Sequence, residues 1–235
     1  MNAESAGHRR DFTTFFAGTY SAILAQAIML CGDRADAEDA TQEAFVEAYR
    51  VWGRIAAYDT PEAWIHRVMV QRLWKTYRKR RTGQQLLLHL PVPVQAGPEQ
   101  TAEAREVLRL LATLPPRQRI TLVLFCLEGR SQQDIAKALR MTRGGVAANV
   151  AKARQTLREA LRMGANEVDG RAPLVAGMGA GWPGRFEARR IGAGQDQLVR
   201  ALLDTQSWLR AAVEADPQTL DRARAALAER LAAQE

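Results

Sequence analysis

The stretch Glu128–Leu157, EGRSQQDIAKALRMTRGGVAANVAKARQTL, decides the fold because it predicts two helices joined by a very short turn. Ser131 is placed to cap the first helix, whose apolar residues Ile135 and Leu139 lie four positions apart. The letters RMT then form a turn, and Thr142 is placed to cap the second helix. This pattern predicts a helix-turn-helix, and a plain helical hairpin is the alternative at this point.

The second of these helices opens with two adjacent glycines. Gly144 and Gly145 would each cost a helix interior about 0.5–1 kcal/mol relative to alanine. A first turn without side chains can approach a DNA backbone closely, and its free N–H groups can donate to phosphate. An inward apolar stripe follows, made of Val146, Val150, Ala153 and Leu157. Contacts to base edges and phosphates would come from Arg143, Asn149, Lys152 and Arg154.

The charge balance of the whole chain agrees with a polyanionic partner. Its 235 residues are 47% hydrophobic, enough for one or two buried cores, and carry a formal net charge of +7. Such a charge favours nucleic acid or an acidic membrane surface, with plain surface solubility as the alternative. The N-terminus has no apolar signal region, and no uninterrupted apolar run approaches the ~18 residues of a membrane span. We therefore expect a cytoplasmic protein without membrane insertion.

The chemistry-bearing residues show no pattern of a catalytic or metal site. Cys31 and Cys126 lie far apart in apolar runs, so we expect them to be buried and reduced. Ser131 has no nearby histidine, and metal-ligand spacing is lacking at His8, His66 and His89. We expect neither an enzyme nor a bound metal or cofactor.

Helical periodicity dominates the chain and predicts an all-α protein with two helical domains. In the first domain, 1–82, an apolar helix ends at Gly32, an amphipathic helix follows, residues 54–60 form a loop, and Pro61 opens a further helix. Residues 83–100 hold three prolines and show no helical period, so we interpret them as a flexible linker. The second domain, 101–163, is helical throughout, including TLVLFCLEG, which we interpret as a buried helix.

The remaining segment, 164–235, begins with a glycine-rich stretch and closes with two amphipathic helices. Their apolar stripes are Leu198, Leu202, Leu209 and Val213, then Leu220, Leu227 and Leu231. Asp216 and Pro217 form the cap and first position of the last helix. Short helices are marginal alone. We therefore expect this tail to fold back on either domain or on the linker and to modulate activity, with binding of another protein as the alternative.

The flanks of the helix-turn-helix resemble a known family. LPPRQR at Leu114–Arg119, an apolar helix and the EG-S-QDIA pattern at Glu128–Ala136 resemble region 4 of bacterial RNA polymerase sigma factors of the extracytoplasmic-function group. GDRADAEDATQEAFVEAYRVW and PEAWIHRVMVQRLWKTYRKRR resemble region 2 of the same group. The region 2 motif is most similar to that of the actinobacterial SigE-like set. The resemblance covers about Asp11–Met163 and leaves the tail unexplained.

The resemblance implies a sigma factor that binds core RNA polymerase, recognises the minus-35 promoter element and melts the minus-10 element. Its partners would be the β′ clamp, the β flap and promoter DNA, with an anti-sigma factor as a frequent further partner that the tail would replace here. The clamp-binding helix would be the acidic stripe Asp36, Glu38, Asp39, Gln42 and Glu43. A solvated helix face is the alternative for this stripe.

The same resemblance assigns the DNA contacts. For the minus-10 element the candidates are Arg54, Tyr58, Asp59, Gln71, Arg72, Trp74, Lys75, Tyr77, Arg78 and Lys79. Trp64 falls on an apolar helical repeat and is expected in the core. For the minus-35 element the candidates are Ser131, Gln132, Thr142, Arg143, Gly144, Gly145, Asn149, Lys152 and Arg154.

The sequence also departs from the family pattern. Region 4 often carries a hydroxyl where Gly145 stands and basic or polar residues where Ala147 and Asn149 stand, and region 2 often carries an asparagine where Gln71 stands. Either the minus-35 element is read by backbone approach and DNA shape, or core enzyme supplies most of the affinity. Two alternatives therefore stay open: an autonomous helix-turn-helix regulator that binds duplex DNA as a dimer, and a sigma-like interaction protein with weakened DNA reading.

Overall fold

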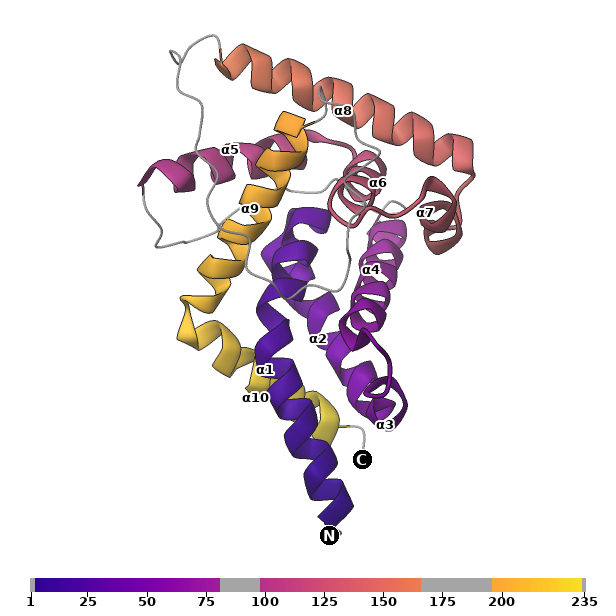
Figure 1. Ribbon diagram of the computed structural model, residues 1–235, viewed down its shortest axis with the longest axis vertical. Coiled ribbons are helices and arrows are strands. Elements are labelled where there is room, and N and C mark those ends of the chain that lie inside the picture. Colours follow the sequence, from indigo (N-terminus) through magenta and orange to yellow (C-terminus); the bar gives the residue numbers. More distant parts are fainter. Residues whose placement is uncertain (1–2, 81–97, 166–195, 234–235) are drawn as a thin grey trace.

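The structure is a computed structural model that describes residues 3–80, 98–165 and 196–233, and every regular element in these ranges is a helix (Figure 1). This confirms the all-α prediction. Most of the predicted linker and the glycine-rich residues 166–195 lie outside the described residues. The described helices form two blocks that pack on each other, with the tail helices along one side.

The first block contains α1 (Ala3–Cys31), α2 (Arg34–Arg50), α3 (Trp52–Ile55) and α4 (Pro61–Arg80). As predicted, α1 stops at Gly32, which adopts φ +74 and donates its N–H to the Ile28 carbonyl at 2.8 Å. Asp33 then caps α2 by accepting from the Asp36 N–H at 2.8 Å.

The prediction that residues 54–60 form a loop between α2 and α4 is partly wrong. The single helical turn of α3 occupies its start, because the N–H groups of Arg54 and Ile55 both donate to the Val51 carbonyl, at 2.9 and 3.1 Å. Ile55 is fully buried and anchors this turn in the core. The sequence of residues 54–60 did not predict this burial. The loop proper begins after Ile55.

Helix α1 is the central element of the first block. Asp11–Cys31 matches a membrane span in length and, at a mean hydropathy of 1.5, in composition, although Thr, Ser and Gln interrupt its apolar run. Of its most apolar window, 72% is buried inside the protein. Phe16 lies 4.8 Å from Phe45 of α2, centroid to centroid, at 73°. This segment is therefore a core helix that α2 and α4 cover.

The second block contains α5 (Pro98–Thr113), α6 (Pro116–Cys126), α7 (Gln132–Leu139) and α8 (Arg143–Ala165). Helix α5 begins at Pro98, inside the predicted linker, so the predicted boundary at 101 is wrong by one helical turn. Proline fits the first position of a helix because that position needs no N–H donor. Helix α6 is mostly buried, which confirms a helix over TLVLFC, whereas the last three residues of the predicted TLVLFCLEG, Leu127–Gly129, lie beyond its end.

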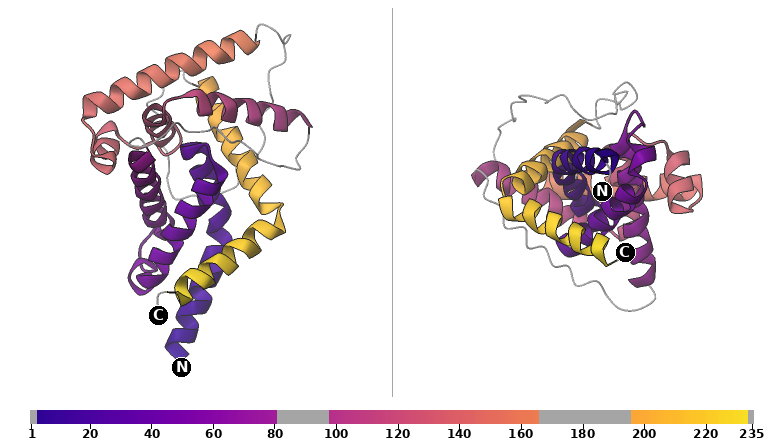
Figure 2. Two further views of the ribbon diagram at one scale, coloured as in Figure 1. Left: turned by 180° about the vertical axis from the view of Figure 1, so that it is seen from behind. Right: turned by 90° about the horizontal axis from the view of Figure 1, so that it is seen from below.

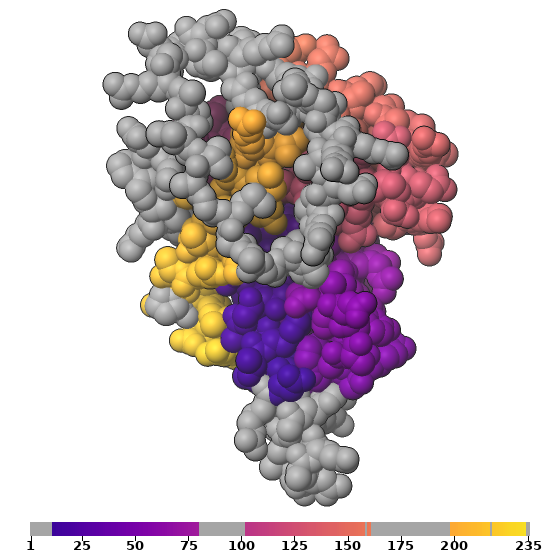
Figure 3. All heavy atoms as spheres, viewed as in Figure 1, coloured from indigo at the N-terminus to yellow at the C-terminus, as the bar shows by residue number. Residues whose placement is uncertain are grey.

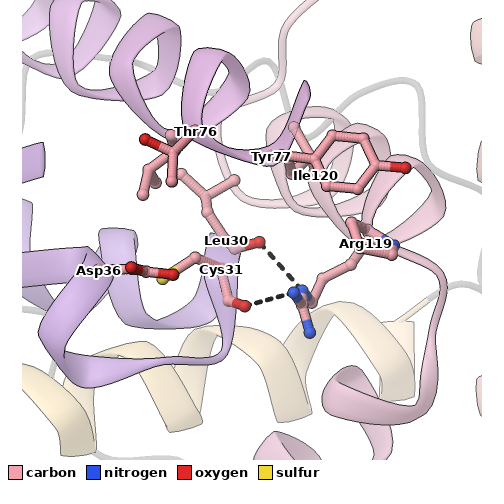
Figure 4. Close-up of a pocket in the computed structure, with 9 residues that line it drawn as sticks. Leu30, Cys31, Asp36, Thr76, Tyr77, Arg119 and Ile120 are labelled. Atoms are coloured by element: carbon pink, nitrogen blue, oxygen red, sulfur yellow. Dashed lines mark hydrogen bonds between the residues drawn. The ribbon is translucent and has the colours of Figure 1, made fainter. Parts of the chain in front are cut away.

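Arg119 of α6 joins the two blocks by capping the C-terminal end of α1 (Figure 4). Its side chain is 2% exposed, with Nε donating to the Leu30 carbonyl at 3.0 Å and Nη2 donating to the Cys31 carbonyl. The last carbonyls of a helix have no partner within the helix, so the guanidinium satisfies them. Burial lowers the pKa of Arg119 below its ordinary value. Burial of the Cys31 thiol likewise raises its pKa, to about 12.

The tail forms α9 (Asp196–Glu214) and α10 (Pro217–Ala232). Helix α9 packs between α1 and α5, and α10 packs on α2, as the views from behind and from below show (Figure 2). Figure 3 shows the orange and yellow tail against the indigo first helix. The predicted inward leucines Leu198, Leu202 and Leu209 are buried. The expectation that the tail folds back on the domains is confirmed.

Candidate nucleic-acid interface

The helix-turn-helix has the local geometry that the sequence predicts. Ser131 accepts from the Asp134 N–H at 3.1 Å and so caps α7, and Thr142 accepts from the Gly145 N–H at 3.0 Å and so caps α8. Between them Arg140 adopts the left-handed conformation, with φ 52 and ψ 50. Val146, with the rest of the predicted inward stripe, is buried.

The first turn of α8 forms an exposed, nearly bare surface. Thr142, Arg143 and Gly144 are exposed, and a Cβ added at Gly144 would meet nothing within 4 Å. A Cβ at Gly145 would lie 3.0 Å from the Thr142 hydroxyl, so this glycine also serves the cap. Of the other minus-35 candidates, Ser131 and Lys152 are exposed and Gln132 is half-buried.

Two predicted minus-35 residues turn toward the protein instead. Asn149 is half-buried and donates through Nδ2 to the Gly145 carbonyl at 2.7 Å. Arg154 lies over the Phe125 ring at 5.2 Å and donates to the Cys126 sulfur at 3.7 Å. Each side chain therefore has a partner within its own block, and its assignment to DNA stays a prediction.

Helix α4 presents a basic face. Gln71, Lys75, Arg78 and Lys79 are exposed, and so is Arg67, which was not among the predicted residues. Arg72 is held by α2, because its guanidinium lies 2.5 Å from Glu47 and 3.4 Å from Glu43. Helix α3 and the loop after it add three exposed candidates: Arg54 lies in α3, and Tyr58 and Asp59 lie in the loop, where Tyr58 is 43% exposed.

The two aromatic candidates on α4 point into the junction of the blocks. Trp74 is 7% exposed, lies 5.3 Å from the Tyr77 ring and has Arg117 of α6 at 6.0 Å from its own ring centre. Tyr77 is half-buried and packs against the core, as does Trp64. The core position of Trp64 agrees with its prediction. Trp74 is buried beside Arg117 of α6, so its assignment to DNA stays a prediction.

The acidic stripe lies along the exposed side of α2. Its opposite face is buried through Ala37, Ala40, Thr41 and Ala44. Glu38 pairs with Arg34 at 2.7 Å, and Asp39 pairs with Arg230 of α10. Beside Asp39, a polar hollow of about 460 Å³ is lined by Asp39, Glu43, Val46, Glu47, Arg50, Arg72 and Arg230. Asp36, Gln42 and Glu43 are half-buried.

A buried polar cluster, which sequence reasoning missed, links α4 to the loop before α7. Glu128 accepts from Arg130 Nε at 2.7 Å, and its other oxygen lies 2.9 Å from His66 Nε2. Arg130 Nη2 lies 3.3 Å from His66 Nδ1. The EG-S motif therefore anchors the helix-turn-helix on the first block.

No group of three metal-ligating side chains is placed to hold an ion within residues 3–80, 98–165 and 196–233. The described cysteines are both free, with Cys126 buried and Cys31 half-buried. What the described residues bring together is a set of charged helix faces on α2, α4 and α8.

Known proteins share both blocks. The family described as Sigma-70 region 2 matches residues 16–82, and Sigma-70 region 4 matches residues 104–157. An RNA polymerase sigma-E factor of Streptomyces avermitilis is 31% identical over 71% of this chain and 92% of its own length. The ECF RNA polymerase sigma factor SigM of Mycobacterium tuberculosis is 29% identical over 67% of this chain and 80% of its own.

A solved structure shares the fold. The sigma factor RpoE, in its co-crystal structure with the anti-sigma factor NepR from Bartonella quintana, matches 65% of this chain and 98% of its own with a TM-score of 0.50. At 23% identity this match speaks to the fold alone. The region 2 and region 4 matches and the curated relatives place the chain among the bacterial RNA polymerase sigma factors of the extracytoplasmic-function group.

Proposed function

We propose that this sigma factor docks on core RNA polymerase through the acidic face of α2 and contacts promoter DNA through α4 and α8. The segregation of charge among these helices carries the proposal. In a chain of net charge +7, α2 exposes carboxylates, whereas α4 and the start of α8 expose lysine and arginine. Carboxylates suit a basic protein partner, and exposed lysine and arginine suit phosphate.

For the minus-35 element, we propose contact through the bare first turn of α8. Gly144 lets the helix backbone come close to the DNA, and Arg143 and Lys152 are exposed for phosphate contacts. With Asn149 and Arg154 engaged inside the block, few long side chains remain for base edges. Recognition would then depend on DNA shape more than on direct base contacts.

For the minus-10 element, we propose that the loop after α3 captures an unpaired base while α4 tracks the phosphates. Tyr58 supplies an exposed ring for stacking, with Arg54 and Asp59 as polar neighbours. Lys75 and Lys79 lie on the exposed face of α4. Binding of this kind weakens steeply as salt rises.

The partners and location follow from the family. Sigma factors are non-enzymatic initiation factors, so we expect no catalytic activity from the chain alone. We propose that the β′ clamp takes the first block, that the β flap takes the second, and that the chain acts in the cytoplasm with the polymerase. An anti-sigma factor, such as the NepR that accompanies RpoE in the matched co-crystal structure, stays a prediction for this chain.

Run-off transcription with purified core enzyme tests the proposal. Added chain should yield a promoter-specific transcript, and Tyr58→Ala should lower its amount about tenfold, because a stacked base contributes about 1–3 kcal/mol. Tyr58→Phe keeps the ring and is the matched control. A template already open at the minus-10 element should restore transcription by Tyr58→Ala. If core enzyme gains no promoter preference from the wild-type chain, the proposal fails.

The inward positions of Asn149 and Arg154 favour a second candidate, a sigma-like interaction protein with weakened DNA reading. It would bind core enzyme without directing it. The same assay separates the two functions, because this candidate predicts capture of the chain by core enzyme with no transcript from the promoter.

A further inference from the structure

We infer that the two tail helices are an intramolecular inhibitor, in which α10 covers the core-binding face of α2 and α9 holds the two blocks together. The inference rests on the proposed role of α2. It assigns a regulatory role to the segment beyond residue 157, where the region 4 match ends.

Helix α10 is attached to α2 near both of its own ends. At its start, the Thr219 hydroxyl accepts from Arg34 Nη2 at 2.8 Å, and Asp216 lies 3.9 Å from the same guanidinium. Near its end, Arg230 donates to Asp39. These contacts fix where α10 lies along α2.

Apolar packing secures the helix between its polar ends. Ala223 and Leu227 are 1% and 8% exposed and belong to the continuous core that includes the first block. The polar contacts therefore do not have to hold α10 alone, since burial of its apolar side adds to them.

Arg230 occupies the position that a basic partner would need. Asp39 is the most exposed carboxylate of the acidic stripe, with its side chain 58% exposed even when paired. A cationic residue of the core enzyme could pair with Asp39 only after Arg230 has left. The tail thus presents the same charge to α2 as the proposed partner, which makes the two binding events mutually exclusive.

Helix α9 extends the contact to the second block. It packs along α1 on one side and α5 on the other (Figure 1), with Leu202, Thr205 and Leu209 at most 1% exposed. Separation of the blocks would expose this surface. Release of α10 from α2 and separation of the blocks are therefore coupled through α9.

Two full-length variants test the inference through their affinity for core RNA polymerase. Arg230→Glu places a negative charge beside Asp39 and should tighten core binding about threefold to tenfold, because partly exposed ion pairs are modest in strength. Arg224→Glu is the matched control: it makes the same charge change on α10, where Arg224 pairs with Asp221 of its own helix, at 3.6 Å. The control should stay within about twofold of wild type.

Leu227→Asp releases α10 by a different route, through its buried face, and should tighten core binding at least as much as Arg230→Glu. Hydrogen exchange reports where each variant has opened. Amides of α2 and α10 should exchange faster while those of α6 and α8 keep their protection, which shows that the blocks stay folded.

The outcomes separate the inference from the proposed function. If the wild-type chain binds core enzyme and both release variants bind it equally or more weakly, the inhibitor role is overturned while the function stands. If neither wild type nor any variant binds core enzyme, the proposed function itself fails. Tighter binding by both variants, with Arg224→Glu unchanged, supports the inhibitor.

Discussion

At the scale of single residues, Gly32 is a position where one added methyl group would strain both the backbone and the packing. Its φ of +74 costs other residues about 1–2 kcal/mol, and an added Cβ would lie 2.7 Å from Arg119 Nη1. Gly32→Ala should lower the free energy of unfolding by about 2–4 kcal/mol in urea denaturation. Arg140→Gly, at another left-handed position, is the control and should cause no loss. Equal stability of Gly32→Ala and wild type would contradict the packing described.

Substitution of Gly144 by alanine should change the free energy of unfolding in the opposite direction to Gly32→Ala. A Cβ there meets nothing, so Gly144→Ala should raise the free energy of unfolding by up to about 1 kcal/mol. The same methyl group would keep α8 from the DNA backbone, so the contribution of the minus-35 element to run-off transcription should fall severalfold. Gly18→Ala, also in open space on α1, should gain stability with transcription unchanged. A Gly144→Ala chain that keeps full minus-35 dependence would exclude close backbone approach.

At the scale of helices, the cap of α10 predicts a pH dependence. The Thr219 hydroxyl, donating to Asp216 at 2.5 Å, holds the pKa of this carboxyl below its ordinary range. The stabilisation is therefore complete above the unfolded-state pKa and is lost as pH falls through the folded-state value. Asp216→Asn should melt at a lower temperature than wild type at pH about 7, and this difference should shrink below pH about 4. A difference that persists at pH about 2 would assign the effect to something other than the charge.

Helix ends were the most predictable part of the fold because their signals are local. Gly32, Pro61, Ser131, Thr142 and Asp216 each mark a boundary through their own backbone or side chain, and the structure confirms all five. The short α3 and the early start of α5 were missed, since one helical turn leaves too little periodicity to detect.

At the scale of the whole molecule, the polar cluster around Glu128 should contribute to joining the blocks. Glu128→Gln removes the charge shared by Arg130 and His66 and should cost about 1.5–3 kcal/mol of unfolding free energy. The exposed Glu103 of α5 provides the control, since Glu103→Gln should stay within about 0.5 kcal/mol. Denaturation in urea measures both. Equal effects would show that the cluster does not stabilise the chain.

The contacts between elements were the least predictable from sequence. An apolar stripe tells which side of a helix is buried, but not which surface covers it, so the two partners of α9 could not be assigned. Arg119 looked like an ordinary basic residue of the LPPRQR motif, and arginine is rarely buried. The contacts of Trp74 with Arg117 and of Arg154 with Phe125 were not predicted either, because these partners lie far apart in the sequence. Both residues were therefore assigned to DNA.

Helix α9 must satisfy α1 on one side and α5 on the other. A substitution in α9 that improves packing against α1 can disrupt packing against α5, so the sequences of all three helices must change together. The tail is consequently not a portable module. Grafted onto another member of the family, it would reach surfaces that never adapted to it, and it would bind them poorly.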